Sequence, residues 1–410
     1  MKDAKYNSKY PRILFYCDTD HNKSLFGKIS EKLANTTLIN QQNIENIKRT
    51  PCGCDKIIRN IENDYSKYLQ YKYKTPQNSL RVLFKKWQRL GASEKSYQRR
   101  YRKYKIKKEF EKWVTFFHLS DCDIVAAWCP IKPKRRIVFE AALICNKSLL
   151  YFEDSPIPGY IICDHKGING GLSLKKDIKF YEKFDYNDNI NFDQIFNNIK
   201  QRKPSLKKPK YLQSKILKFK KNTIYCPLQV QDDTQIVQYG SWLKSIGQFI
   251  EIIYKASRKL PDDWQLVIRE HPSSDISFTK NLASLSDDKF LVDNTSDSIE
   301  IIKHSKAIVT INSSVGFHAL LKSMPVIVCG DAFWGFKPIS YSVSNEDDLI
   351  KIFTNIDSLK INSSAIKKYL NYLFKQIFIP INFKNTGYTI SDNDIKLIYS
   401  TSIKSLNFYN

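Results

Sequence analysis

Residues 307–335 constrain the fold of this chain more than any other stretch. Two short, β-branched apolar runs, 307–311 and 326–329, have the length of buried strands and are too short for helices. The residues between them have the composition of a helix, which must end before Pro325. A strand, a helix and a second strand in this order are typical of a parallel sheet, so the stretch predicts an α/β fold.

The turn between the first strand and the helix predicts an anion-binding site. Asn312, Ser313 and Ser314 provide amide and hydroxyl groups that cap the free N–H groups at the start of a helix. These N–H groups and the helix dipole favour a negatively charged ligand at one spot. Gly316, in the first helical turn, would let such a ligand approach the backbone closely. The alternative is an ordinary capped helix, and the local pattern leaves both interpretations open.

The alternation of strands and helices over 410 residues predicts two domains. The first domain, 1–215, carries a basic helical insertion at about 51–120, and the second, 216–360, contains the stretch described above. Residues 361–410 are expected to be helices that pack back on the first domain. A basic segment with two prolines, 201–221, is the predicted linker. Strands are expected at 12–17, 124–128, 148–152, 160–162, 223–230 and 264–269.

The composition indicates a globular protein that binds polyanions. Hydrophobic residues make up 42% of the chain, which excludes a disordered protein, and the formal net charge is +25. Such an excess attracts nucleic acid, anionic lipid surfaces or acidic glycans without choosing among them. No apolar run approaches the roughly 20 residues that cross a bilayer, and the first residues lack a signal peptide, so a cytoplasmic location is expected. The nine scattered cysteines are expected to be free thiols, and zinc is not expected.

The most basic part of the chain, residues 81–113, carries thirteen Lys or Arg residues interleaved with aromatics. Such a segment can bind single-stranded nucleic acid by charge and stacking. It can also lie on an anionic membrane surface, or it can be a solvated helix whose aromatic side chains pack inward. We favour inward packing for the aromatic side chains and membrane contact for the charges.

Three predicted loops of the second domain each follow a strand, at 231–235, 270–274 and 312–316. Since ligands of open α/β sheets bind at the carboxyl ends of the strands, we expect these loops to converge there. In the first domain, Glu153 and Asp154 also follow a predicted strand, where paired acids are catalytic, bind a cation or cap a turn. The set suits a phosphate-bearing ligand.

Six segments of the sequence resemble the capsule-synthesis family of bacterial β-Kdo glycosyltransferases. They are AAWCPIKPKRRIVFEAA (126–142), FED (152–154), GGLSLKKDIKFY (170–181), PLQVQDDTQI (227–236), REHP (269–272) and TINSSVGFHALLKSMPVIVCGDAFWG (310–335). The likeness covers roughly 120–340 and is strongest to a retaining β-Kdo transferase domain of O-antigen synthesis. After Glu-Asp, where the family usually has Gly-Phe-Leu-Arg, this chain has Ser-Pro-Ile-Pro at 155–158, which leaves the acceptor less certain than the donor.

This resemblance implies a GT-B-like pair of Rossmann-type domains facing a central cleft. It also implies that CMP-β-Kdo is the donor substrate and that no cofactor or metal is needed. The expected acceptor is a lipid-linked surface glycan, O-antigen or capsule, of a Gram-negative bacterium. The enzyme would work in the cytoplasm, peripheral to the inner membrane or to a membrane-bound assembly complex, and would not bind nucleic acid.

The resemblance also implies roles for individual residues. Retention by double displacement requires a carboxylate nucleophile, for which Asp232 is the candidate and Asp233 the fallback. Glu153 or Asp154 would deprotonate the acceptor hydroxyl. Donor-binding candidates are Gln231, Arg269, His271, Pro272, Asn312, Ser313, Ser314, Gly316 and Lys134.

The donor-binding candidates divide by the anion that each would contact. His271 would contact the phosphate or the sugar carboxylate, and Ser313 and Ser314 would hold the phosphate at the helix start. Arg269 and Lys134 would pair with the sugar carboxylate, whose charge needs a partner once it is desolvated. Bland alternatives remain for three of the candidates: a turn residue for His271, a helix cap for Asp233 and a solvated basic loop around Lys134.

Three other functions are kept as alternatives. Another CMP-sugar transferase, such as a sialyltransferase, would also use two domains, a His-Pro dipeptide and a hydroxyl-rich helix start. A nucleic-acid-binding protein would use the basic segment 81–113 and would bind in a steeply salt-dependent way. A non-catalytic scaffold of a polysaccharide assembly complex would turn over no donor.

Overall fold

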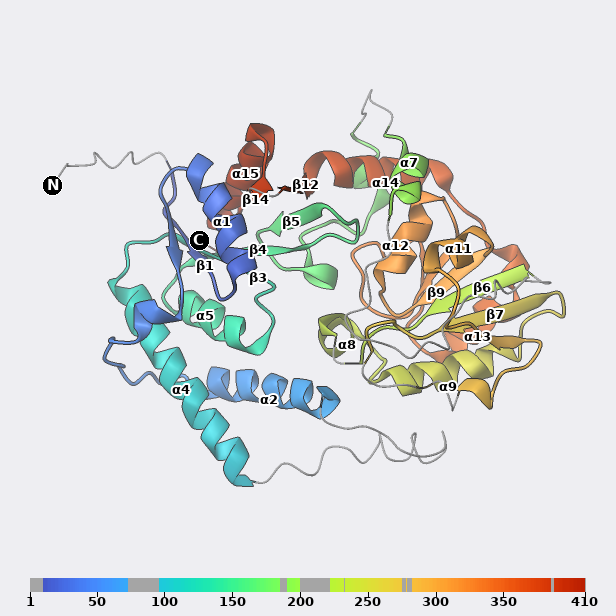
Figure 1. The fold of residues 1–410 in the computed structure, drawn as a ribbon, viewed down its shortest axis with the longest axis horizontal. Helices are drawn as coiled ribbons and strands as arrows, with labels where there is room; N and C mark the ends of the chain where they lie inside the picture. The colour runs from blue at the N-terminus through green and yellow to red at the C-terminus, as the bar shows by residue number, and fades with distance from the viewer. Residues whose placement is uncertain are drawn as a thin grey trace.

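The computed structural model describes residues 10–72, 96–184, 190–199, 222–231, 233–274, 278, 282–384 and 387–409. Within these ranges the chain forms two α/β domains that lie side by side (Figure 1). Each domain is built on a six-stranded sheet, and a separate two-stranded hairpin lies near the C-terminus.

The N-terminal sheet has the strand order β12-β5-β4-β3-β1-β2. Strands β2, β1, β3 and β4 are parallel, whereas β5 and β12 are antiparallel additions at one edge. The strands are β1 (Ile13–Tyr16), β2 (Thr36–Ile39), β3 (Ile124–Trp128), β4 (Ser148–Asp154), β5 (Tyr160–Asp164) and β12 (Phe378–Pro380). Every residue of β3 is buried, as its all-apolar sequence requires when both faces of a sheet are covered.

Helices cover both faces of this sheet and give the domain two hydrophobic cores. One core, around Phe15, Phe26 and Phe152, lies under α1 (Asp20–Lys32) and α15 (Asp392–Tyr409). The other core includes Trp113 and Phe117, and the helices around it are α2 (Asp55–Lys72), α4 (Ser96–Leu119) and α5 (Pro133–Ile144). Helices α2 and α4 lie within the predicted basic insertion and extend from the domain surface (Figure 1).

The C-terminal sheet is entirely parallel, in the order β11-β10-β9-β6-β7-β8. If its strands are numbered 1 to 6 from β6 to β11 and the sheet is followed from β8 to β11, the order is 3-2-1-4-5-6, that of a Rossmann sheet. The direction in which strands are added reverses between β6 and β9. The strands are β6 (Asn222–Pro227), β7 (Trp264–Arg269), β8 (Phe290–Val292), β9 (Ala307–Thr310), β10 (Val326–Val328) and β11 (Tyr341–Ser342). Its helices are α8 (Thr234–Tyr239), α9 (Ile246–Ser257), α11 (Ser298–Lys303), α12 (Ser314–Leu321) and α13 (Glu346–Thr354).

The end of the chain crosses back to the first domain. Helix α14 (Ser363–Gln376) packs in a hydrophobic cluster that includes Ile162 of the first domain and Phe317 of the second. Helix α15 packs on the first domain, where Ser405 Oγ donates to the Leu149 carbonyl at 2.6 Å. Short elements complete the description: η1 (Gln41–Ile44), η2 (Asn169–Gly171), η3 (Ile356–Ser358), α6 (Ile178–Tyr181), α7 (Phe192–Asn197), β13 (Asn382–Lys384) and β14 (Gly387–Thr389).

The predicted fold class is confirmed: the protein has a GT-B-like arrangement of two Rossmann-type α/β domains, with C-terminal helices packed on the first. The tail differs from the all-helical prediction, because the apolar, β-branched run at Phe378 extends the first sheet as β12. The predicted boundary at 215/216 and the linker 201–221 lie outside the described residues. Among the described helices, none has both the length and the apolar character needed to cross a bilayer.

Candidate active site

A cleft of about 630 Å³ lies between the two domains. The N-terminal wall is formed by the residues that end β3 and β4, and the C-terminal wall by those that follow β6, β7 and β9. The cleft therefore lies where the Rossmann sheet reverses its winding, which is where such sheets bind nucleotides. It contains residues of all three predicted loops: Asp233 and Gln235, then Glu270, His271, Pro272 and Ser273, then Asn312, Ser313 and Ser314.

Arg269, the last residue of β7, is the most informative group in the cleft. Its side chain is only 8% exposed, and its Nη1 donates to Ser298 Oγ, which also hydrogen-bonds the Tyr225 hydroxyl at 3.1 Å. Its Nε has no hydrogen-bond partner, and no acid in the described part of the chain forms an ion pair with its guanidinium. A buried cation without a counter-ion is costly, so this site is suited to binding an anion.

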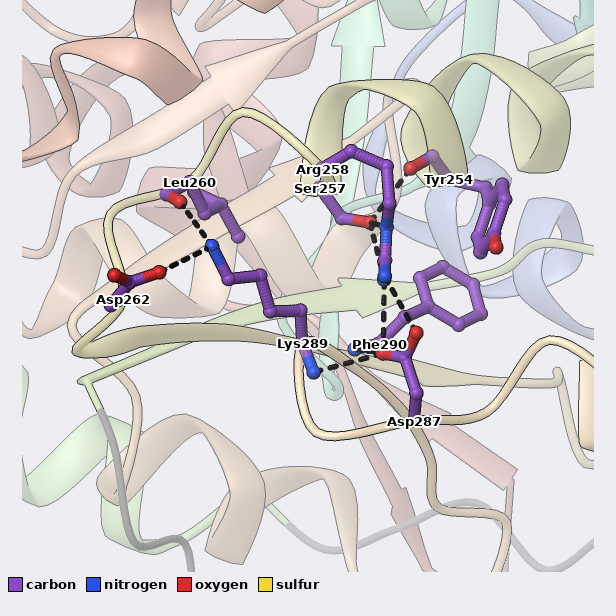
Figure 2. A network of polar contacts seen from close by, with 8 residues as sticks. All are labelled: Tyr254, Ser257, Arg258, Leu260, Asp262, Asp287, Lys289 and Phe290. Atoms are coloured by element: carbon purple, nitrogen blue, oxygen red, sulfur yellow. Dashed lines mark hydrogen bonds and ion pairs between the residues drawn. The ribbon is translucent and has the colours of Figure 1, made fainter.

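Arg258 shows how the same domain holds an arginine that is fully paired (Figure 2). Its Nη1 and Nη2 donate to the two oxygens of Asp287 at 2.6 and 3.0 Å, and its guanidinium lies 4.8 Å from the centre of the Tyr254 ring. This bidentate pair raises the pKa of Arg258 and lowers that of Asp287. Arg258 has a carboxylate and lies away from the cleft, whereas Arg269 lines the cleft and has none.

His271 and the start of α12 add donors to the same wall. The Nδ1 of His271 accepts a hydrogen bond from the Ser273 N–H at 3.1 Å, so the neutral ring carries its proton on Nε2. Ser313 caps α12 by accepting from the Val315 N–H at 3.3 Å, and Ser314 is exposed in the cleft. Helix α12 has eight residues and its N-terminus faces the cleft, so its dipole adds positive potential beside Arg269.

Two donor-binding candidates, Asn312 and Gly316, also make close packing contacts. Asn312 is 1% exposed, exchanges hydrogen bonds with the Gln229 amide, and donates to the Gln235 and Tyr239 carbonyls at 2.8 and 2.9 Å. It therefore fastens α8 to β9. A Cβ on Gly316 would lie 3.0 Å from Thr310 Cγ2, so glycine lets α12 pack closely on the sheet.

Glu153 and Asp154 end β4 and line the opposite wall. The pKa of the Glu153 carboxyl is raised to about 7. Burial is the main cause, a hydrogen bond from the Cys129 thiol opposes the rise, and the charge of Asp154 adds to it. Cys129, directly after β3, is buried and has a left-handed backbone with φ of 42°. A carboxyl with a pKa near neutrality suits proton transfer at physiological pH.

The remaining candidates are dispersed. Gln231 is buried and its Oε1 accepts from the Ile246 N–H at 3.2 Å, which places it at the start of α9 and outside the cleft lining. Lys134 lies in α5 rather than in the predicted loop, exposed and close enough to lower the pKa of Glu109, and does not line the cleft. Asp233 lines the cleft and is the N-cap of α8. Asp232 lies outside the described residues.

The cleft also contains residues that sequence reasoning missed. Lys132 lies at its edge, two positions before the predicted Lys134. His318, one turn after Ser314 on α12, hydrogen-bonds through Nε2 to the Pro156 carbonyl of the other domain at 2.9 Å. Cys129 directly follows a strand, as Glu153 and Asp154 were predicted to do, and could have been found in the same way. Gln229 lies in the segment 227–236, from which only Gln231 and the two aspartates were chosen as candidates. In the described residues, no three His, Cys, Asp or Glu side chains are arranged to hold a metal ion.

The fold and the cleft define a class of protein. It has two GT-B-like domains, and in the cleft between them a cationic wall at the end of a Rossmann sheet faces an acidic wall. Comparison with known proteins then gives a family match over part of the chain. Residues 194–383 match the family described as capsule polysaccharide biosynthesis protein, which confirms the resemblance that the motifs predicted.

Individual relatives extend this comparison. The chain is 24% identical over 325 residues to the capsule polysaccharide export protein KpsS of Escherichia coli, covering 65% of this chain and 81% of KpsS. It is 28% identical over 193 residues to protein FixF of Sinorhizobium fredii, covering 46% of this chain and 44% of FixF, so it spans less than half of that protein.

Among solved structures, the β-Kdo 2,7 transferase of Thermosulfurimonas dismutans KpsC has a TM-score of 0.42 and 17% identity, over 68% of this chain and 85% of that one. The β-Kdo 2,4 transferase of the same KpsC has a TM-score of 0.40 and 13% identity, over 68% of this chain and 87% of that one.

Proposed function

We propose that this protein is a retaining β-Kdo transferase that moves Kdo from CMP-β-Kdo to a lipid-linked bacterial surface glycan. The family match to capsule polysaccharide biosynthesis and the motifs shared with β-Kdo transferases support the substrate class. The cleft at the switch point of a Rossmann sheet supports a nucleotide donor.

The observation that carries the proposal is the buried guanidinium of Arg269, which has no counter-ion among the described residues. A CMP-linked acidic sugar brings two negative groups, a phosphate and a carboxylate. Arg269, the Nε2–H of His271 and the N-terminus of α12 lie in one cleft and together offer three separate sources of positive potential. We assign them to these two anionic groups, with Lys132 at the edge of the cleft taking the role first given to Lys134.

The proposed chemistry has two displacements at the anomeric carbon. In the first, an Asp232 oxygen bonds to that carbon while its bond to the phosphate oxygen breaks and CMP leaves with the electron pair. In the second, the acceptor hydroxyl oxygen bonds to the same carbon, its proton passes to Glu153 or Asp154, and Asp232 is released as a carboxylate. Two inversions retain the donor configuration. Burial keeps Glu153 near the pKa that such proton transfer needs.

The test is CMP release from freshly generated CMP-Kdo, followed for the wild-type chain with and without lipid-linked glycan. We expect release with CMP-Kdo and not with CMP-sialic acid, because a sialyltransferase would show the reverse preference. Turnover of neither donor, while a known Kdo transferase works in the same mixture, would contradict the proposal and favour a scaffold.

Helix α4 supports the proposed membrane contact. Tyr101 and Tyr104 are 59% and 52% exposed, and the exposed Lys105 and Lys108 continue the same stripe, with Lys105 Nζ 4.7 Å from the centre of the Tyr101 ring. The inward packing that we favoured for the aromatics therefore holds for Phe110 and not for these two tyrosines. A convex stripe of lysine and tyrosine complements an anionic lipid surface, which would bring the enzyme to a lipid-linked acceptor.

A further inference from the structure

One of the contacts between the two domains is polar and lies in the cleft lining, between α8 of the C-terminal domain and the η2 loop of the N-terminal domain. The Gln235 side-chain amide donates to Asn169 Oδ1. Figure 1 shows α8 at the edge of its domain that faces the N-terminal sheet. Helix α8 begins directly after Asp233, so this contact is one helical turn from the acids to which the proposed function gives the first displacement.

The packing at this contact leaves little room for a side chain at positions 170 and 171 of η2. A Cβ on Gly170 would lie 2.8 Å from the Asp331 carbonyl oxygen and 2.9 Å from Cδ1 of the Tyr239 ring. A Cβ on Gly171 would lie 3.0 Å from the Tyr239 hydroxyl. The two glycines therefore allow the Tyr239 ring to lie directly on the η2 backbone.

Both partners of the contact are held rigidly by their own domains. On the N-terminal side, Asp164 accepts hydrogen bonds from the N–H groups of Lys166, Gly167 and Ser173, which fixes the loop around η2. On the C-terminal side, the Asn312 amide holds the Gln235 and Tyr239 carbonyls. Tyr239 also lies close enough to Glu153 and Cys129 for their charges to raise the pKa of its hydroxyl, together with burial, to about 12.

We propose that this contact is a clamp that positions the two catalytic walls: the Gln235–Asn169 hydrogen bond and the Tyr239–Gly170 packing fix the start of α8, which Asp233 caps, against the Glu153 wall. This inference rests on the proposed function and adds positioning residues to it. Asn169 and Gln235 also line the cleft, and the role proposed for them is to hold the two domains in place. They set how far the acids of one domain lie from the acid of the other, a distance on which the rate depends steeply.

The hydrogen bond can be tested with a charge cycle. Asn169→Asp keeps an acceptor for the Gln235 amide, and Gln235→Glu keeps a hydrogen bond if Asn169 turns its amide to donate. The double variant places two carboxylates face to face, which repel. We expect the double variant to lose at least about tenfold more kcat than the product of the two single losses, because residues in contact are not additive.

The packing can be tested with a matched pair of glycines. Gly170→Ala should lower kcat and leave CMP affinity unchanged, because its Cβ has no room. Gly27→Ala is the control, because a Cβ there meets nothing within 4 Å. Lys322→Ala, which removes an ion pair with Asp193 away from the clamp, controls for the loss of a polar contact.

A second readout does not depend on the donor. Hydrogen exchange at 167–172 and 235–240 should rise together in the double variant and in Gly170→Ala, and in neither control. If the wild-type chain turns over no CMP-Kdo, the proposed function fails and the exchange pattern alone decides the clamp. Additive kcat losses with unchanged exchange would overturn the clamp, and so would a fall in CMP affinity equal to the fall in kcat.

Discussion

The two walls of the cleft are built in opposite ways. The C-terminal wall consists of loops that follow parallel strands, and its functional groups are fixed positive potential: Arg269, the His271 ring N–H and the start of α12. The N-terminal wall offers carboxyls at the end of β4, one of them with a pKa raised to about 7, beside the left-handed backbone of Cys129. The first wall is suited to holding an anion and the second to moving a proton.

This difference teaches how the two domains share the work. Arg269 has no counter-ion among the described residues, so a bound anion would stabilise its buried charge. Glu153 is held by Cys129 and burial at a pKa where both protonation states are populated. Substitutions in one wall should therefore change donor affinity, and those in the other should change the rate and its pH dependence.

The largest expected effect comes from Glu153→Gln. If Glu153 is the base, transfer to the acceptor should fall by about 10²- to 10⁴-fold while CMP affinity is unchanged. In the wild-type enzyme the carboxylate is the active form, so kcat/KM should rise with pH through a pKa of about 7, and the variant should lose this rise. Asp154→Asn is the comparison: a larger loss there would assign the base to Asp154 instead.

Stability gives a second check on Glu153. The folded-state pKa lies above the ordinary value of 4.5, so below about pH 4.5 the carboxyl is neutral in both states. Above about pH 7 it is charged in the folded state at a cost in free energy. The melting temperature of Glu153→Gln should therefore gain on that of the wild type as pH rises from 4.5 to 7. A constant difference would contradict the raised pKa.

Arg269→Met should separate binding from stability. We expect donor affinity to fall by about 10- to 100-fold, since a charged hydrogen-bond partner is lost. The melting temperature without ligand should stay equal or rise, because the variant buries no unpaired charge. Arg258→Met is the matched control, in which affinity stays and stability falls by up to about 1 kcal/mol. The KM for CMP-Kdo and thermal unfolding without ligand measure the two effects. Unchanged affinity in Arg269→Met would remove Arg269 from the donor site.

A smaller effect is expected outside the cleft, on the α4 stripe. Lys105→Gln with Lys108→Gln should weaken binding to vesicles that contain anionic lipid by about 30-fold, at about 1 kcal/mol per lysine. The matched control is Lys259→Gln with Lys351→Gln, which removes the same charge from the other domain. Equal losses in both pairs would mean that net charge alone matters. Loss of RNA binding without loss of vesicle binding would point to nucleic acid.

Cys129→Ala should have the smallest effect. The thiol's hydrogen bond lowers the Glu153 pKa, so its removal should move the pH–rate profile to higher pH with little change in the plateau. Cys129→Ser, which keeps a donor, should stay near the wild-type profile. A shift to lower pH in Cys129→Ala would contradict the assignment of this hydrogen bond.

The sequence predicted the C-terminal wall better than the N-terminal wall, for a physical reason. In an all-parallel sheet the carboxyl ends of all strands lie at one edge. Locating strands β7 and β9 in the sequence was therefore enough to predict that His271 and Ser313 lie in the same cleft. The packing contacts of Asn312 and Gly316 were not predicted, because they depend on partners distant in sequence.

The contacts across the domains could not be predicted from local pattern. His318 reaches Pro156, and Gln235 reaches Asn169, each from a residue far away in the chain. Lys134 was predicted in a loop, but Pro133 at the first position starts α5 early and carries Lys134 to the outside. Strand β12 was missed because a three-residue strand next to a helix has no periodicity to recognise.

The central claim is that the cleft holds CMP-Kdo and passes its sugar through a covalent Asp232 adduct. Intact-protein mass after incubation with freshly generated CMP-Kdo tests it most directly, with the wild-type chain, Asp232→Asn and Asp232→Cys side by side. We predict a gain of one Kdo in the wild-type chain that maps to position 232 and is absent from Asp232→Asn. No adduct and no CMP release in any form, while a known Kdo transferase works in the same mixture, would contradict the account.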